Sequence, residues 1–278
     1  MKKILYLLTI VFLASCAPDV KDNVIYGLDH RRDYHQVTNP VVLKNMRSTV
    51  AIVEASSVTK VAGGMVFKTR IFGQAYGLCP KEPYWYQPIF AYCSGFAVND
   101  STIVTAGHCG DAILNSYLIF GYQSSGTNLY SLSAPDSLVY RVKSIKKRIK
   151  TSTVDFLVLT VDKKIPTHRI AAVNTSFKPR TGTKVYCVGY PCGLPVKMTS
   201  GATIRANRGT YFTTNLDTYG GNSGSAVFNQ STNRIEGILV RGEDDFVRSG
   251  NCNVSKRCTD TGCRGEEVVW IDQVVKYF

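Results

Sequence analysis

Short apolar runs rich in β-branched residues recur along this chain between turn-forming residues, and they constrain its fold more than any other feature. Runs of this length and composition are typical of strands, because helical patterns extend over longer stretches. We therefore predict an all-β protein that folds as one compact unit. The last segment, 272–278, is predicted to be a short helix. The runs taken as strands include 48–53, 64–67, 102–104, 156–161, 184–188 and 235–240.

Three segments each supply one residue type of a nucleophilic hydrolase, in the order histidine, aspartate and serine. His108 lies in the segment TAGHC, Asp155 opens the apolar run DFLVL, and Ser223 lies in the segment GGNSGS. A serine hydroxyl is a poor nucleophile, so it needs an imidazole to take its proton and a carboxylate to fix the tautomer of that imidazole. The chain contains one candidate for each role.

The glycines around Ser223 allow a sharp turn and a close approach to a substrate carbonyl. The backbone N–H groups of Gly221 and Ser223 are therefore candidates for an oxyanion hole. The alternative is an ordinary turn between two strands, since turns use the same residue types. Asp155 would open a buried strand, where a carboxylate needs a partner, whereas Asp162 at the far end is interpreted as a turn residue.

At these motifs the chain resembles the trypsin-like (chymotrypsin-fold) serine endopeptidases, whose functional residues follow the same order. The resemblance implies that His108 is the general base, Asp155 its orienting partner and Ser223 the nucleophile. Within this family the chain is most similar to the bacterial glutamyl-endopeptidase-like branch. The residues that indicate this branch are VIYG at 24–27, Arg32, GYP at 189–191 and GGNSGS at 220–225.

The same resemblance implies a fold of two packed antiparallel β-barrels with the three motifs at the cleft between them. Residues 24–165 would form the N-terminal barrel, which carries the histidine and the aspartate. Residues 166–278 would form the C-terminal barrel, which carries the serine and the short C-terminal helix. A disulfide bond between Cys93 and Cys109 is implied as the link between the histidine loop and the preceding strand.

Two positions depart from the family pattern. Asn222 stands where animal members carry the aspartate that pairs with a newly cut N-terminus, so that ion pair is not available here. The strand after Ser223 has no histidine, although a histidine there confers glutamate preference in the bacterial branch. We therefore do not expect glutamate specificity from this strand.

Asp217, six residues before Ser223, occupies by resemblance the base of the pocket for the side chain before the cleaved bond. A carboxylate in a partly desolvated pocket favours a lysine or arginine side chain, which predicts cleavage after basic residues. Arg241 is expected on the wall of the same cleft. It would either pair with Asp217 and cancel its charge, or point to solvent and leave Thr218 to make the pocket polar.

The N-terminus has the pattern of an export signal, with a basic start and a short apolar stretch. Residues 1–15 resemble a bacterial lipoprotein signal peptide, Cys16 would be the lipidated first residue, and 16–23 would be a tether. By resemblance to Gram-negative lipoproteins, Ala17 favours the outer membrane. We expect an exported protein of the cell envelope, held to the membrane by its N-terminal lipid. Ordinary secretion, with release outside the cell, is the alternative.

Eight of the nine cysteines remain after Cys16, an even number that suits disulfide bonds in an oxidising compartment. Apart from the pair implied above, their partners are not assigned. A zinc site is the alternative for the last three, but no histidine lies near them. The unassigned cysteines are Cys79, Cys187, Cys192, Cys252, Cys258 and Cys263.

The chain is basic, with 33 Lys and Arg against 20 Asp and Glu and a net charge of +13. The basic cluster at 143–150 has no interleaved aromatic residues, so we interpret it as a solvated strand edge rather than a nucleic-acid site. The predicted partners are protein or peptide substrates and, through the lipid, a membrane. No nucleic acid, metal or cofactor is implied.

These observations predict a secreted or lipid-anchored serine endopeptidase that hydrolyses peptide bonds through an acyl-enzyme. The alternative is a non-catalytic surface protein that uses a protease-like scaffold for binding. The presence of all three motif residues together with the oxyanion glycines favours the enzyme.

Overall fold

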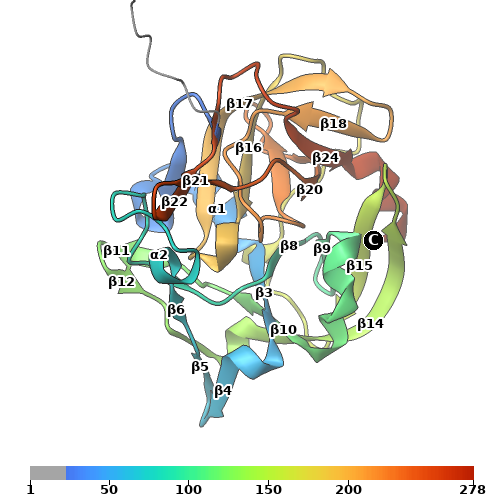
Figure 1. Ribbon diagram of the computed structural model, residues 1–278. Coiled ribbons are helices and arrows are strands. Elements are labelled where there is room, and N and C mark those ends of the chain that lie inside the picture. Colours follow the sequence, from blue (N-terminus) through green and yellow to red (C-terminus); the bar gives the residue numbers. More distant parts are fainter. Residues whose placement is uncertain (1–22) are drawn as a thin grey trace, which may run out of the picture.

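The computed structural model describes residues 23–278, whose regular structure is mostly strand (Figure 1). Six antiparallel strands of the N-terminal half close into a barrel. Closure leaves no unpaired edge in this sheet. The spatial order is β10 (Ser116–Phe120), β14 (Val139–Lys150), β15 (Asp155–Val161), β9 (Thr102–Thr105), β8 (Cys93–Ala97) and β3 (Thr49–Glu54).

The C-terminal half forms a second six-stranded antiparallel barrel, which closes where its last strand pairs with its first. The predicted all-β fold of two antiparallel barrels is therefore confirmed. The spatial order is β16 (Lys184–Gly189), β19 (Ala226–Asn229), β20 (Ile235–Arg241), β24 (Glu266–Trp270), β18 (Tyr211–Thr214) and β17 (Lys197–Asn207).

The first residues of the described chain pack against the second barrel rather than the first. β1 (Asn23–Tyr26) runs parallel to β23 (Arg257–Cys258), and β2 (Arg31–Asp33) pairs with the edge of β17. The predicted N-terminal barrel began at residue 24, whereas the structure begins that barrel at β3. Strand pairing explains the difference, because β1 pairs with a strand of the C-terminal half and with no strand of the first barrel among the described residues.

One apolar cluster runs through both barrels and joins them. It includes Phe96 and Phe156 from the first barrel and Phe228 and Val269 from the second, all fully buried. Each such phenylalanine contributes roughly 1.5–3 kcal/mol through burial. A smaller cluster around Trp270 fills the interior of the second barrel. The junction that carries the candidate site is therefore a rigid, packed region.

The C-terminal segment returns from the second barrel to the first, where its end lies beside β15 (Figure 1). The short helix predicted there consists of two successive 3-10 turns, Ile271–Gln273 and Val275–Tyr277. The Tyr277 ring packs on Phe156, with 5.7 Å between the ring centroids. Within residues 23–278, no helix is both long and apolar enough to span a membrane.

The remaining helices and strands lie outside the two barrel sheets. Helix α1 (Pro40–Arg47) leads into the first barrel, and Asn39 caps it by accepting hydrogen bonds from the second and third helical N–H groups. The other elements are α2 (Phe72–Ala75), β4 (Val58–Val61), β5 (Gly64–Phe67), β6 (Arg70–Ile71), β7 (Pro88–Ile89), β11 (Ser124–Gly126), β12 (Leu129–Tyr130), β13 (Ser133–Pro135), β21 (Phe246–Ser249) and β22 (Cys252–Ser255).

Six of the eight cysteines in the described residues form disulfide bonds. The predicted bond between Cys93 and Cys109 is present, and Cys187 and Cys192 are buried free thiols. The zinc alternative does not describe the C-terminal cluster, because each of its three sulfur atoms lies in a disulfide. The other bonds join Cys79 to Cys252 and Cys258 to Cys263.

Candidate active site

His108 and Asp155 meet where two paired strands of the first barrel end. His108 lies in the 3-10 turn Gly107–Asp111 after β9, and Asp155 is the first residue of β15. The Asp155 Oδ2 atom is 2.7 Å from His108 Nδ1, and its Oδ1 atom accepts the His108 backbone N–H at 3.0 Å. Because both carboxylate oxygens bind the same residue, Asp155 fixes the position and the rotation of the imidazole.

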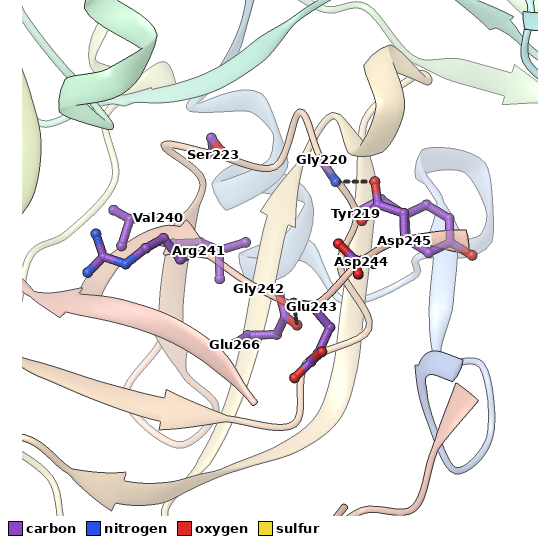
Figure 2. Close-up of a pocket in the computed structure, with 11 residues that line it drawn as sticks. Tyr219, Gly220, Ser223, Val240, Arg241, Gly242, Glu243, Asp244, Asp245 and Glu266 are labelled. Carbon is purple, nitrogen blue, oxygen red and sulfur yellow. Dashed lines mark hydrogen bonds between the residues drawn. The ribbon is translucent and has the colours of Figure 1, made fainter. Parts of the chain in front are cut away.

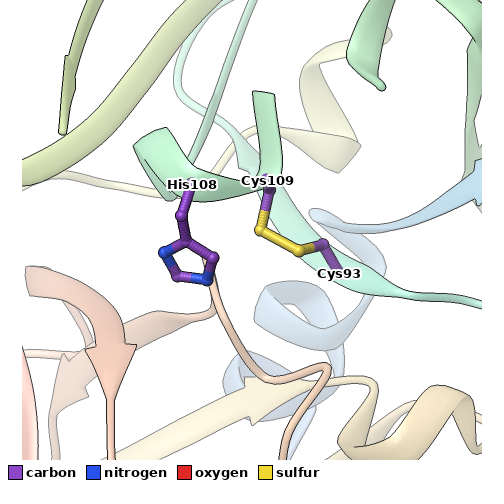
Figure 3. Close-up of side chains that lie close together, drawn as sticks. All are labelled: Cys93, His108 and Cys109. Carbon is purple, nitrogen blue, oxygen red and sulfur yellow. A yellow bond between two sulfur atoms is a disulfide. The ribbon is translucent and has the colours of Figure 1, made fainter. Parts of the chain in front are cut away.

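The sequence around His108 fits this geometry closely. A Cβ atom on Gly107 would lie 2.1 Å from the carbonyl oxygen of Ile149 and 2.7 Å from Asp155 Oδ1, so only glycine allows the approach. On the other side, the disulfide between Cys93 and Cys109 ties the turn to β8, with the His108 ring beside it (Figure 3). The turn is thus held from both flanks.

Metal binding is a separate question for this group. The sulfur atoms of Cys93 and Cys109 and a ring nitrogen of His108 lie within 4.8 Å of one another. The two sulfurs are joined to each other, so they offer no thiolate ligand. This cluster therefore serves to position the histidine.

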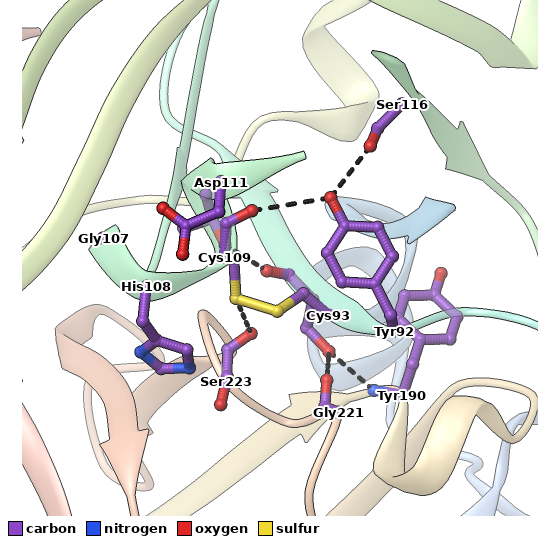
Figure 4. Close-up of a disulfide and its surroundings, with 12 residues drawn as sticks. Tyr92, Cys93, Gly107, His108, Cys109, Asp111, Ser116, Tyr190, Gly221 and Ser223 are labelled. Carbon is purple, nitrogen blue, oxygen red and sulfur yellow. Dashed lines mark hydrogen bonds between the residues drawn. A yellow bond between two sulfur atoms is a disulfide. The ribbon is translucent and has the colours of Figure 1, made fainter. Parts of the chain in front are cut away.

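Ser223 comes from the loop before β19 in the second barrel and faces His108 across the junction (Figure 4). Ser94 of the first barrel anchors this loop. Its N–H donates to the Ser223 carbonyl at 2.9 Å, and its hydroxyl donates to the Gly221 carbonyl at 2.8 Å. Gly224 allows the contact, because its φ is +89° and a Cβ there would lie 2.2 Å from the Ser94 carbonyl oxygen. Ser94 could not be predicted as a site residue from the sequence, because it belongs to no recognisable motif.

The backbone amides of the serine loop divide into bonded and free groups. Asn222 N–H donates to the Tyr219 carbonyl, and Gly224 N–H donates to the Leu239 carbonyl. The N–H groups of Gly221 and Ser223 donate no hydrogen bond to any residue in the range 23–278. These are the two amides predicted to form an oxyanion hole, and neither is used by a hydrogen bond within the described residues.

A pocket of about 250 Å³ opens beside Ser223, and four carboxylate side chains contribute to its wall (Figure 2). Glu243 is paired with Lys256 at 2.9 Å. None of the other three forms an ion pair within the described part of the chain. The lining residues are Tyr219, Gly220, Ser223, Leu239, Val240, Arg241, Gly242, Glu243, Asp244, Asp245 and Glu266.

Two of these carboxyl groups are strongly perturbed by their surroundings. Burial raises the pKa of Glu266 to about 8, although the Thr218 hydroxyl donates a 2.5 Å hydrogen bond to it. Burial also raises the pKa of Asp245 to about 6, against a hydrogen bond from the Gly220 N–H. The negative charge of the pocket therefore increases between about pH 6 and pH 8.

Asp217 does not line this pocket, which corrects the expectation from its spacing to Ser223. Its side chain is buried on the other side of the wall, where Oδ1 accepts the Tyr26 N–H and Oδ2 accepts the His30 N–H, both at 2.8 Å. Thr218 is likewise buried and points to Glu266. The backbone of the N-terminal segment thus binds the Asp217 carboxylate, which the sequence predicted to bind the substrate.

Arg241 lines the pocket as predicted, but its guanidinium points away from the four carboxylates (Figure 2). It forms neither of the arrangements expected from the sequence, since it pairs with Glu267 and approaches Asp155 instead of Asp217. Arg241 therefore does not compensate the negative charge of Asp244, Asp245 and Glu266.

Two closed antiparallel barrels with a histidine, an aspartate and a serine at their junction define the class of chymotrypsin-fold serine proteases. A family model described as "Trypsin-like peptidase domain" matches residues 93–238, and the chain belongs to that family. The resemblance to trypsin-like serine endopeptidases is thus confirmed.

Two solved structures are similar to this chain, and the first of them has the same fold. The structure of Glu endopeptidase in complex with MPD is 19% identical, has a TM-score of 0.50, and the match covers 84% of this chain and 94% of that one. Rv3671c from M. tuberculosis H37Rv, in an inactive mutant form, is 15% identical with a TM-score of 0.49, over 91% and 93% of the two chains. No curated protein sequence matches this chain.

Proposed function

We propose that this chain is an active serine endopeptidase in which Ser223 attacks the peptide bond. The observation that carries the proposal is the 2.7 Å hydrogen bond between His108 Nδ1 and Asp155 Oδ2. It assigns the proton to Nδ1, so the other ring nitrogen, Nε2, is left to accept a proton from the serine hydroxyl. His108 is then the general base, and Asp155 orients it.

The reaction would proceed in two halves. In the first, Ser223 Oγ forms a bond to the substrate carbonyl carbon, its proton passes to His108 Nε2, and the Gly221 and Ser223 amides bind the oxyanion. Collapse breaks the C–N bond, and the amine leaves with the proton held by His108. In the second half, a water oxygen forms a bond to the acyl carbon as its proton passes to His108 Nε2. The bond from that carbon to Ser223 Oγ then breaks, His108 returns the proton to Oγ, and the acid product leaves.

The competing function, a non-catalytic binding protein, makes a different prediction for covalent labelling. A fluorophosphonate reacts with a serine only where a base activates it and an oxyanion site receives the phosphoryl oxygen. An active enzyme should be labelled on Ser223, and the modified peptide should be identified by mass spectrometry. A folded protein that stays unlabelled would support the binding protein instead.

The pocket chemistry favours cleavage after lysine or arginine. Asp244, Asp245 and Glu266 line the same pocket as Ser223, and this cavity is large enough for a long side chain. A cation that enters gains charge-assisted hydrogen bonds, whereas a glutamate side chain would meet like charge. Basic specificity, expected from the sequence, would thus arise from these three residues instead of from Asp217.

The preference for basic side chains is expected to increase with pH. Glu266 and Asp245 are neutral below their raised pKa values of about 8 and about 6, so the pocket carries less negative charge in acid. The ratio of kcat/KM for lysine substrates to that for alanine substrates should rise between about pH 5 and pH 9. Taking the ratio cancels the titration of groups that serve both substrates.

Glu266→Gln should lower this ratio at about pH 9 by roughly 10- to 100-fold, the range of one hydrogen bond to a charged group. Glutamine keeps an acceptor for Thr218, so the pocket should stay folded. Glu236→Gln is the matched control, because Glu236 is also a buried acid of the second barrel, but it bonds to Asn174 and Asn229 away from the pocket. An unchanged lysine preference in Glu266→Gln would contradict the assignment.

We also propose export with lipid attachment at Cys16, which lies outside the described residues, as do the predicted signal at 1–15 and almost all of the tether at 16–23. Three disulfide bonds in the described chain support an oxidising compartment. Mass spectrometry of the N-terminal peptide from the membrane fraction tests the proposal. An unlipidated N-terminus in secreted protein would support simple secretion.

A further inference from the structure

Arg241 lies at the junction of the two barrels, at the end of the strand that follows the serine loop. It is the last residue of β20, and Leu239 in the same strand accepts the Gly224 N–H and donates to the Ser225 carbonyl. In the sheet, Arg241 stands opposite Glu267 of β24. The strand that carries Arg241 is therefore hydrogen-bonded directly to the loop that carries Ser223.

The Arg241 side chain crosses from the second barrel to the first. Nε donates to Glu267 Oε2 at 2.6 Å, and Nη1 donates to the Thr151 carbonyl at 3.4 Å. Nη1 is also 3.9 Å from Asp155 Oδ2, the oxygen that binds His108 Nδ1. The positive charge of Arg241 thus lies between Glu267 of the second barrel and Asp155 of the first.

The Arg241 guanidinium is partly buried, so the nearby carboxylates of Glu267 and Asp155 stabilise its charge. The side chain is only 27% exposed, and within residues 23–278 the buried Nη2 atom has no hydrogen-bond partner. A partly buried cation needs nearby anions to offset lost hydration. Glu267 holds one edge of the guanidinium, and Asp155 is the anion that its other side faces.

We propose that Arg241 is a positioning residue that keeps Asp155, and through it His108, in register with Ser223. This inference rests on the proposed protease function. Among the described residues, the Asp155 carboxylate accepts hydrogen bonds only from His108, so it makes no hydrogen bond to the second barrel there. Arg241 supplies an electrostatic link from the serine side, together with its bond to Thr151.

The alternative is that Arg241 contacts substrate, since it also lines the pocket. The direction of the guanidinium, away from the pocket carboxylates and toward Asp155, favours positioning (Figure 2). The two roles differ in kinetics. A substrate contact that is equal in ground and transition states changes KM, whereas misplacement of the reacting groups lowers kcat.

The test compares Arg241→Met and Arg241→Lys with the unmodified protein on one peptide substrate. Arg241→Met should lower kcat by roughly 10- to 100-fold, with KM changed by no more than about twofold. Arg241→Lys should restore part of kcat, because a lysine keeps the charge but loses the forked geometry. If the methionine variant does not fold, the lysine variant still tests the same split between kcat and KM.

A double-mutant cycle with Glu267→Gln strengthens the test. Glu267 orients Arg241, so its replacement should lower kcat, and the double variant should be no slower than Arg241→Met alone. A rise in KM at constant kcat would make Arg241 a substrate contact, and unchanged kinetics would overturn the inference while the protease function stands. If the unmodified protein neither cleaves peptides nor reacts with a fluorophosphonate, the protease function and this inference both fail.

Discussion

Ser223→Ala is expected to reduce kcat by about a million-fold and to abolish fluorophosphonate labelling. Alanine removes the atom that attacks the carbonyl, so no acyl-enzyme can form, and only the oxyanion amides and substrate binding remain to assist water. The anchoring of the loop uses backbone groups, namely the Ser223 carbonyl that accepts the Ser94 N–H. The loop should therefore keep its conformation.

The measurement is single-turnover cleavage of a lysine-containing peptide, with thermal unfolding of each variant as the check on folding. Ser231→Ala provides the matched control, since Ser231 is exposed in the turn after β19 and its side chain touches no part of the site. It should cleave and label like the unmodified protein. Equal activity in Ser223→Ala would remove Ser223 from the mechanism and point to a contaminating protease.

Site residues could be predicted from the sequence where tight local contacts restrict which residue types fit. Gly107 must be glycine because Ile149 and Asp155 approach its Cα, and Gly224 must be glycine because Ser94 does so. Such tight contacts leave short motifs around His108 and Ser223, which the sequence analysis recognised. The same motifs also allowed the two-barrel fold to be predicted, because they are typical of a family whose members share that fold.

The pocket was harder to predict, because its chemistry depends on which distant segments fill it. Asp217 has the family spacing to Ser223, yet the backbone of Tyr26 and His30 binds its carboxylate. The acidic residues that line the cavity come from the loop after β20 and from β24. In the sequence, the strands β19 to β23 lie between Ser223 and Glu266. No local pattern marks such residues, since only tertiary packing brings them together.

Asp155→Asn is expected to lower kcat by about 10,000-fold, the next largest effect after loss of the nucleophile. The amide has the shape of the carboxylate, and its oxygen can still accept the His108 backbone N–H that now bonds to Oδ1. Its NH₂ group would then face Nδ1 as a donor, so the ring must present Nδ1 as an acceptor and carry its proton on Nε2. A protonated Nε2 cannot take the proton of Ser223.

The comparison should be made by kcat and KM at one pH, with circular dichroism to confirm the fold. Asp162→Asn is the matched control, because Asp162 follows the far end of β15 and its carboxylate accepts, within residues 23–278, a single hydrogen bond, from the Arg141 N–H. It removes the same charge from the same barrel and should leave kcat unchanged. A loss of less than about tenfold in Asp155→Asn would mean that His108 adopts the productive tautomer without Asp155. The hydrogen bond at Nδ1 would then have only a structural role, and Asp155 would no longer be assigned as the residue that orients His108.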